Sequence, residues 1–180
     1  MFGPILKLIT TCDERRPSTA LAPELDGLFL QLRAAPDPAS ASQIEELIWR
    51  YWMDHSDPEA SAQLDRATRA IGADRHDEAA QLLDQIIAAH PDFAEAWNKR
   101  ATLKFLIDRP AESLADINST LLLEPRHFGA ICGFGQICLR RGERDSALFA
   151  FDVALRINPH LEGIRNARDQ LLRRGPPTAH

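Results

Sequence analysis

The stretch IIAAHPDFAEAWNKRA, residues 86–101, contains a break between two helix-like runs. An apolar run ends at His90-Pro91, and a second run with helical spacing begins two residues later. Proline lacks a backbone N–H and clashes with the preceding turn, so it cannot extend the first helix. The break is therefore predicted to be a joint that lets the next helix pack antiparallel to the first.

The same joint recurs along the chain at a fixed spacing. Proline stands at positions 91, 125 and 159, so the interval between successive joints is constant. Small residues keep this period at two further positions and bulky apolar residues at a third. These three sets are Ala67, Ala101 and Gly135; Ala79, Ser113 and Ala147; and Leu83, Ile117 and Phe151. A 34-residue period with two helices in each period indicates a helical solenoid.

The period divides the central part of the chain into three units, each with a first helix, a tight turn, a second helix and a proline. Their predicted bounds are 60–93, 94–127 and 128–161. We expect Gly72 and Gly142 to supply the left-handed residue that ends the first helix of their units. Pro110 is expected to start a second helix, where its missing N–H costs nothing.

Residues 24–58 are predicted to form a degenerate leading helix pair that covers the open end of the stack. Its second helix is expected to be capped by Ser40 or Ser42. The pair carries a heavy aromatic load, namely Phe29, Trp49, Tyr51 and Trp52. We expect these rings to pack on the first unit, and an exposed remainder would be a docking patch.

The two ends of the chain are predicted to contain one helix and two flexible segments. Residues 160–174 read as a capping helix and residues 175–180 as a disordered tail. Residues 1–23 read as a flexible segment or the remnant of a signal or anchor, because DERRPSTALAP is rich in charge and proline. The apolar start lacks the basic residues of a secretory signal, and Cys12 has a poor context for lipid attachment. We therefore favour the cytoplasm, with a periplasmic or membrane-anchored location through residues 1–12 as the alternative.

The composition argues against several classes of protein. The net charge is -5 and the arginines are scattered among acids, whereas nucleic-acid binding usually shows a basic stripe. No apolar run is long enough to span a membrane. The three cysteines, Cys12, Cys132 and Cys138, make neither a disulfide framework nor a zinc pattern, and are expected to be small apolar filler.

The sequence does not indicate an enzyme. No two histidines lie four residues apart on a helix, so a helical metal pair is missing. His90, His127 and His160, which stand at or near the joints, are expected to have structural roles at helix ends. The GFG at 133–135 lacks the preceding strand of a dinucleotide site, and no nucleophile-elbow pattern occurs. We therefore predict no catalysis, no metal and no cofactor, except for a site assembled across units, which sequence cannot show.

These residues resemble the tetratricopeptide repeat, a family whose 34-residue unit has favoured residues at fixed positions. The matches in the first unit are Ala67, Ala79, Leu83 and Pro91; in the second, Trp97, Ala101, Ile117 and Pro125; in the third, Gly135, Ala147, Phe151, Ala154 and Pro159. The departures are Gln63, Ile86, Ser113, Thr120 and Ile131. The resemblance implies an all-α, right-handed solenoid of antiparallel helix pairs, similar to small stand-alone bacterial members of the family.

In this family the first helices usually line a concave groove that holds a peptide or a partner segment. The resemblance therefore implies a non-catalytic adaptor or scaffold with a protein or peptide partner. The positions that match the groove are Leu64, Thr68, Ile71, Glu95, Asn98, Lys99, Thr102, Phe105, Gly129, Cys132, Gly133, Gln136, Leu139 and Arg140. The alternative is a structural or assembly subunit that associates with itself, or docks through its aromatic leading helices or its outer face.

Chaperone-binding members of the family grip a C-terminal carboxylate with Lys and Asn residues. The residues at the matching positions here are Leu64, Thr68, Lys99, Gly129 and Gly133. Only Lys99 could contact a carboxylate. We therefore expect acidic chaperone tails not to bind, and an apolar or mixed segment to rest near Phe105 and Leu139.

Three glycines, Gly129, Gly133 and Gly135, fall within seven residues of one predicted helix. Gly135 is the small position where the second helix comes close. Gly129 and Gly133 lie on the presumed groove face, where two readings stay open. Either they clear space for the backbone of a ligand, or they reflect drift in a helix that its neighbours hold in place.

Overall fold

The structure is a computed structural model that describes residues 2–12, 14 and 22–173. The described part of the chain forms ten α-helices and no strand, which confirms the prediction of an all-α solenoid. The helices are α1 Gly3–Thr10, α2 Ala22–Ala34, α3 Pro38–Met53, α4 Pro58–Gly72, α5 His76–Ala89, α6 Ala94–Leu106, α7 Pro110–Leu123, α8 Phe128–Arg140, α9 Arg144–Ile157 and α10 Glu162–Arg173. None of these described helices is both long enough and apolar enough to cross a membrane.

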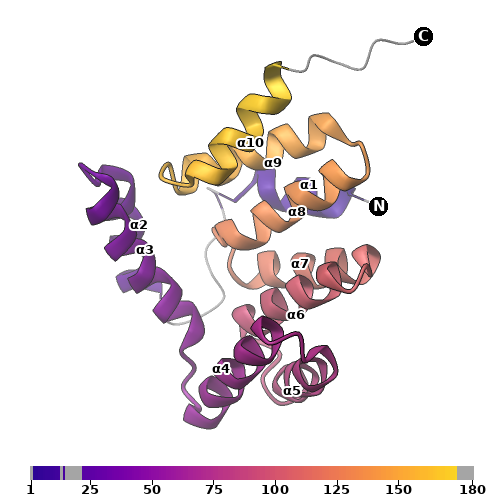
Figure 1. The fold of residues 1–180 in the computed structure, drawn as a ribbon. Coiled ribbons are helices and arrows are strands. Elements are labelled where there is room, and N and C mark those ends of the chain that lie inside the picture. Colours follow the sequence, from indigo (N-terminus) through magenta and orange to yellow (C-terminus); the bar gives the residue numbers. More distant parts are fainter. Residues whose placement is uncertain (1, 13, 15–21, 174–180) are drawn as a thin grey trace.

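Six helices form three pairs that repeat in register: α4–α5, α6–α7 and α8–α9, one pair in each predicted unit (Figure 1). The second helices begin at His76, Pro110 and Arg144, so each start follows the previous one by the interval of the joint prolines. The first helices of the last two pairs begin at Ala94 and Phe128, and the same interval separates them. The period in the sequence is thus a period in the helix boundaries.

A left-handed residue stands at the same place in the turn of each pair. Asp74, Asp108 and Gly142 have φ angles of 56°, 58° and 74°. Gly142 therefore does what the sequence predicts, whereas the prediction for Gly72 is wrong, because Asp74 takes the left-handed position two residues later. The short polar side chain of Asp tolerates this conformation better than most residues do.

The joint prolines follow helix ends, as predicted. The second helices end at Ala89, Leu123 and Ile157, two residues before the joint prolines. At each end, the next residue donates its backbone N–H to the carbonyl four residues earlier, which closes the helix before the proline is reached. Pro110 lies at the start of α7, also as predicted.

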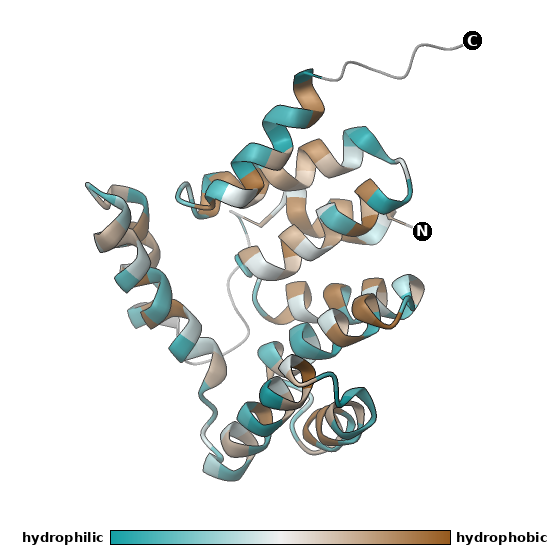
Figure 2. Ribbon diagram, viewed as in Figure 1, coloured by the Kyte–Doolittle hydropathy of each residue, from teal (hydrophilic) through white to brown (hydrophobic). Residues whose placement is uncertain are grey.

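The last helix continues the register of the first helices. Glu162, where α10 begins, stands one full period after Phe128, where α8 begins. The ion pair of Arg168 with Asp152, at 3.5 Å, repeats the pair of Arg100 with Asp84, at 2.7 Å, two periods later. No residue of α10 is buried, and most of its ribbon has the hydrophilic colour (Figure 2). α10 therefore packs on α9 as an unpaired first helix with one face toward water.

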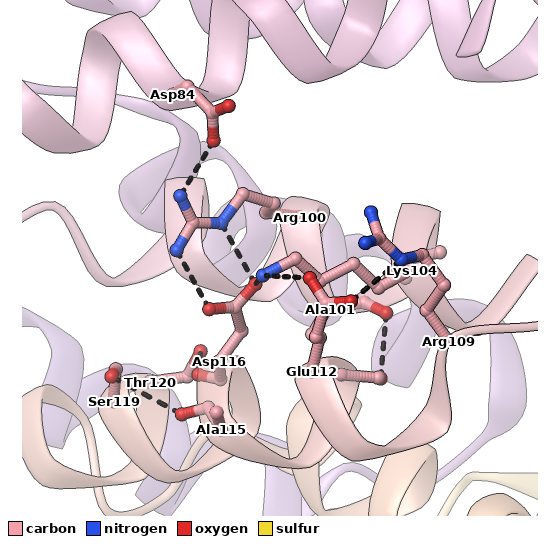
Figure 3. A network of polar contacts seen from close by, with 12 residues as sticks. Asp84, Arg100, Ala101, Lys104, Arg109, Glu112, Ala115, Asp116, Ser119 and Thr120 are labelled. Atoms are coloured by element: carbon pink, nitrogen blue, oxygen red, sulfur yellow. Dashed lines mark hydrogen bonds and ion pairs between the residues drawn. The ribbon is translucent and has the colours of Figure 1, made fainter. Parts of the chain in front are cut away.

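A network of charged side chains connects three helices of neighbouring units (Figure 3). Arg100 on α6 donates from Nε and Nη2 to the two carboxylate oxygens of Asp116 on α7, both at 2.9 Å, and from Nη1 to Asp84 on α5. Lys104 approaches the same Asp116 carboxylate at 2.8 Å. Asp116 is only 2% exposed. A bidentate pair with a buried carboxylate fixes orientation as well as distance, so this network holds α5, α6 and α7 in one arrangement.

The leading helix pair does not cover the open end of the stack, so that prediction is wrong. α2 and α3 pack on each other and run alongside the stack, from the level of α4 to that of α10 (Figure 1). The pair is out of register with the units. Pro58 is the first residue of α4, whereas Pro91 precedes the start of α6 by three residues. The chain therefore turns differently before α4 than it does at the later joints.

The start of α3 also differs from the prediction. Its N-cap is Asp37, followed by Pro38 at the first helical position. The Asp37 carboxylate accepts from the backbone N–H and from the hydroxyl of Ser40, both at 2.9 Å. The predicted caps, Ser40 and Ser42, therefore lie inside the helix. Asp-Pro provides both a cap and a preset φ angle at this helix start.

The beginning of the chain is partly ordered, against the prediction of flexibility for residues 1–23. α1 packs on α7 and α9, and its Ile5 and Ile9, with Cys12 just after it, are 2% exposed or less. Apolar residues four apart on a helix share one face, which explains why so short a helix is held there. Most of residues 13–21, and the predicted tail 175–180, lie outside the described residues.

Gly135→Ala should lower the free energy of unfolding by about 1–3 kcal/mol through overpacking. A Cβ at this position would overlap Cε1 of Phe151 and lie 2.8 Å from Cδ1 of the same ring. Gly163→Ala is the matched control, because nothing lies within 4 Å of a Cβ there, and helix propensity alone should stabilise it by up to about 1 kcal/mol. Urea titrations followed by circular dichroism measure both variants. Equal stabilities would contradict the close approach of α8 and α9.

Candidate binding groove

The predicted groove residues lie on α4, α6 and α8, the first helices of the three pairs. Their exposure differs widely. Thr102 and Arg140 are exposed, whereas Leu64 is 0% exposed inside the core of the first pair. The expectation that Leu64 faces a partner is therefore wrong. Thr68 and Ile71, also on α4, are partly buried.

Part of the predicted set meets in one cavity of about 130 Å³ between α6 and α8. The predicted groove residues that line it are Asn98, Thr102, Phe105, Gly129, Gly133 and Gln136. Ala101, Ser113, Ile117 and Ala130 complete the lining. These described lining residues carry amide, hydroxyl and apolar groups, and none of them titrates near neutral pH. The cavity therefore suits a neutral ligand group better than a charged one.

The remaining residues on α8 border the cavity or lie beside it. The guanidinium of Arg140 lies 4.2 Å from the ring centre of Phe105, and so covers part of that ring. Leu139 is partly buried. Burial, with the charge of Glu45 nearby, raises the pKa of the Cys132 thiol to about 12. Cys132 is therefore an uncharged thiol at neutral pH, which is a poor nucleophile.

A buried polar cluster stands at the other end of the groove, where α6 and α8 begin. Glu95 is 0% exposed, and its carboxylate lies 2.7 Å from His127 Nε2 and 3.0 Å from Lys99 Nζ. Asn98 donates to the same carboxylate at 3.2 Å. His127 Nδ1 accepts the backbone N–H of Ala130 and so caps α8. This bond indicates that the imidazole proton is on Nε2 and points at Glu95.

The cluster changes the acidity of Glu95. Burial by itself disfavours the charged carboxylate, but the hydrogen bond from His127, together with the charge and hydrogen bond of Lys99, outweighs it and lowers the pKa of Glu95. Glu95 is therefore ionised at neutral pH although it is buried. Glu95 is internal, so the expectation that it faces a partner is not met in this structure, whereas Asn98 is 7% exposed and lines the cavity.

The leading helix pair, α2–α3, covers this end of the groove; we call it the strap. The ring of Trp52 stacks on His127 with 4.0 Å between centroids and 13° between planes. Trp49 meets Phe128 edge-on at 5.3 Å, and Lys99 Nζ lies 5.5 Å from the Trp49 ring centre. The strap rings thus pack at the start of the third unit, and the prediction that they pack on the first unit is wrong.

The strap also contacts the joints on either side of that point. His55, just after α3, lies 4.5 Å from His90 at the first joint. At the third joint, Asn158 donates to Glu45 of α3 at 2.8 Å, and His160 Nε2 contacts the carbonyl of Leu32 on α2 at 3.1 Å. Each joint therefore contributes a histidine that contacts the N-terminal segment, which agrees with the structural roles expected for them.

Gly129 makes room for the strap. A Cβ at this position would lie 2.7 Å from Cη2 of Trp49. The space that the missing side chain leaves is filled by a ring of the same chain, so the reading that Gly129 admits a ligand backbone is not supported. A Cβ at Gly133 would meet only Ile117 Cδ1, at 3.6 Å, which is ordinary contact. Both readings of Gly133 remain open.

Sequence reasoning missed the strap because its contacts follow no period. Two features of the sequence pointed to it. Trp49 and Trp52 lie on one face of a helix and need a surface that buries their rings, and Gly129, near a helix start, indicates that another group approaches the backbone closely there. Neither feature shows that the tryptophans are the group that approaches Gly129. Among the described residues, no group of three or more His, Cys, Asp or Glu side chains lies close enough to hold a metal ion.

In-register helix pairs stacked around a concave groove define a helical-repeat protein. No family model matches the chain. A TPR repeat-containing protein of Rhizobium etli is 36% identical over 159 residues, which cover 88% of this chain and 76% of that protein. The chain belongs to the tetratricopeptide repeat (TPR) family.

Solved structures show the same fold at low sequence identity. The first TPR of Spaghetti (RPAP3), bound to the HSP90 peptide SRMEEVD, matches 67% of this chain and 96% of its own with a TM-score of 0.61 and 17% identity. The Sgt2 TPR domain of Aspergillus fumigatus matches 69% of this chain and 88% of its own with a TM-score of 0.54 and 15% identity. A MamA mutant matches 83% of this chain and 84% of its own with a TM-score of 0.52 and 15% identity.

Glu95→Gln should flatten the acid side of the stability profile. The folded-state pKa of Glu95 is lowered from its ordinary value of 4.5, so the ionised carboxylate stabilises the fold above that pH, and this contribution is lost as the pH falls through the folded-state pKa. The variant should be less stable than wild type at pH 7 by about 1–3 kcal/mol. It should also lose less stability on acidification below about pH 5.

Thermal or urea unfolding at a series of pH values measures this difference. Glu46→Gln is the control, because Glu46 is an exposed carboxylate on the strap. It should leave the shape of the profile unchanged. Parallel acid limbs for wild type and Glu95→Gln would show that Glu95 is not an important acid-sensitive group.

Proposed function

We propose that this chain is a non-catalytic interaction module that binds a segment of a partner protein in the uncovered half of its concave groove. The observation that carries the proposal is the cavity between α6 and α8, where predicted groove residues from two units converge. Membership of the TPR family supports a partner that is a protein or a peptide. The comparison with the peptide-bound TPR of Spaghetti supports a groove on this fold that accepts a peptide.

The residues that line the cavity limit the kinds of ligand that it can bind. Thr102 is exposed and Gln136 partly exposed at its lining. The Thr102 hydroxyl donates to the Asn98 carbonyl at 3.1 Å and can still accept from a peptide N–H, and the Gln136 amide can donate or accept. Ile117 and Phe105 supply apolar surface beside them. We therefore propose a neutral segment, with an apolar side chain between α6 and α8 and its backbone near Thr102 and Gln136.

The alternative, a subunit that associates through its aromatic helices, has less support. Phe29 and Trp52 are 3% and 7% exposed, since their rings face the stack. Leu30, on the outer side of α2, is 62% exposed, but it is a single residue of this kind on that helix. Scattered exposed apolar residues are normal on protein surfaces and do not indicate an interface. The groove therefore remains the preferred surface.

Gly133→Leu should abolish partner binding by filling the cavity. The added side chain would project from the lining between α6 and α8. Gly163→Leu makes the same change on α10, at a position where nothing lies within 4 Å. Tagged wild-type protein and both variants are used to capture partners from an extract of the source organism, after their melting temperatures have been compared. A partner that is retained by folded Gly133→Leu would contradict the proposed location.

Acidic chaperone tails should not bind this groove. Lys99 is already paired with Glu95 at 3.0 Å and lies against Trp49, so it is not available to a carboxylate. Fluorescence anisotropy with labelled SRMEEVD peptide tests this expectation. We expect no saturation at micromolar protein. Micromolar binding that Lys99→Ala abolishes would show that the polar end of the groove does take a terminal carboxylate.

A further inference from the structure

α3 presents one face to the stack, and three side chains on it have distinct partners. Glu45 binds the Asn158 amide, Trp49 packs on Phe128 and Trp52 stacks on His127. The three residues are spaced four and three apart in the sequence, so they share one side of the helix. This is the pattern of an amphipathic helix that lies in a groove.

The polar surface beneath α3 is complete without it. The Glu95 carboxylate is held by His127, Lys99 and Asn98, and His127 Nδ1 is bonded to the backbone of Ala130. All of these groups belong to the second and third units. α3 adds ring stacking to the cluster but none of its hydrogen bonds. Removing α3 would therefore leave no member of the cluster without its partner.

The contact surface between α3 and the stack contains an unsatisfied polar group on α3. Nε1 of Trp52 is buried and has no hydrogen-bond partner among the described residues. A buried N–H without an acceptor costs free energy, because the group loses its hydrogen bonds to water. At the margin, Arg126 pairs with Asp26, whose side chain is 56% exposed. Only the Asp26 side of this pair is exposed, because Arg126 is 17% exposed and also lies 4.5 Å from the ring centre of Phe29.

The repeats pack through their own helix pairs, although strap residues such as Leu32 and Ile48 are buried in the same apolar core as α8 and α9. Residues 54–57 link α3 to α4, α3 also contacts α4 and α6, and α2 and α3 pack on each other. The units hold together through their own helix pairs and the network around Arg100. Opening the strap would expose the aromatic seat at Phe128 and the polar cluster together.

We propose that the surface under α3 is a second binding site, specific for an amphipathic helix of a partner that carries an acidic residue followed by aromatic residues four and seven positions later. α3 occupies this site in the free protein, and the partner helix displaces it. This inference extends the proposed function and rests on it, since the displaced strap uncovers the rest of the same groove. The binding energy of the partner must exceed that of α3, which has the advantage of being tethered.

The test uses the full chain and a fluorescent peptide of residues 37–54, DPASASQIEELIWRYWMD. The control peptide has alanine in place of both Trp49 and Trp52. Binding is measured by anisotropy to wild type and to the double variant Trp49→Ala/Trp52→Ala, whose strap is weakened while the seat is unchanged. The double variant should bind the peptide at least ~10-fold more tightly than wild type, because its tethered competitor is weaker. The control peptide should not bind either protein.

Three outcomes would overturn the proposal. These are equal peptide affinity for the two proteins, equal binding of the control peptide, and concentration-dependent dimers of the double variant in place of peptide binding, which would make a second copy the occupant. Adding Gly133→Leu separates this site from the cavity. If Gly133→Leu loses partner capture but still binds the peptide, only the cavity is affected. If the protein captures the partner but does not bind the peptide, only the second site is rejected.

Hydrogen exchange on the wild-type protein keeps the proposal testable if the double variant does not fold. Amides of α3 should exchange faster than those of α6 to α9, because the strap opens while the repeats stay folded. Addition of the unlabelled peptide should increase exchange in α3 further. Exchange of α3 at the same rate as α6 to α9, unchanged by the peptide, would show that the strap opens only when the whole protein unfolds.

Discussion

Close approach between the two helices of each pair is the constraint on which the structure depends. Ala67, Ala101 and Gly135 occupy the same position in successive first helices, and Ala67 and Ala101 are 0% and 3% exposed. At Gly135 the ring of Phe151 lies where a Cβ would be. A single helix pair cannot bury its apolar surface alone, so pairs made compact in this way stack on their neighbours. Helix boundaries, left-handed turn residues and joints then repeat together.

The repeats could be read from the sequence because what defines them is local. Prolines at the joints, small residues at the crossings and Pro110 at a helix start act within one turn of chain. The prediction was wrong where two residue types could fill the same structural position. Asp74, and not Gly72, takes the left-handed position, and Asp37, in place of a serine, caps α3. These errors concern boundaries and leave the fold unchanged.

The strap lies beyond this kind of reasoning because its contacts join distant segments with no period. Amphipathic spacing predicted that α3 is a helix with an apolar face, but not which surface that face would meet. The pattern of the family placed Glu95, Asn98 and Gly129 in an open groove. The structure places the first two in a polar cluster under the strap and leaves the third to accommodate Trp49. The groove that remains open is therefore shorter than the repeats alone would provide.

The position of the strap ahead of the repeats in the sequence has a consequence for synthesis. Glu45 and Asn158 are 113 residues apart, and Leu32 and His160 are 128 apart. The strap therefore leaves the ribosome before the repeats but cannot complete its contacts until the third joint has followed. Helix pairs with local contacts fold in the meantime, whereas contacts between distant segments form late. During that interval the tryptophans of α3 lack their partners on the third unit, and transiently unburied apolar surface of this kind is prone to association with other chains.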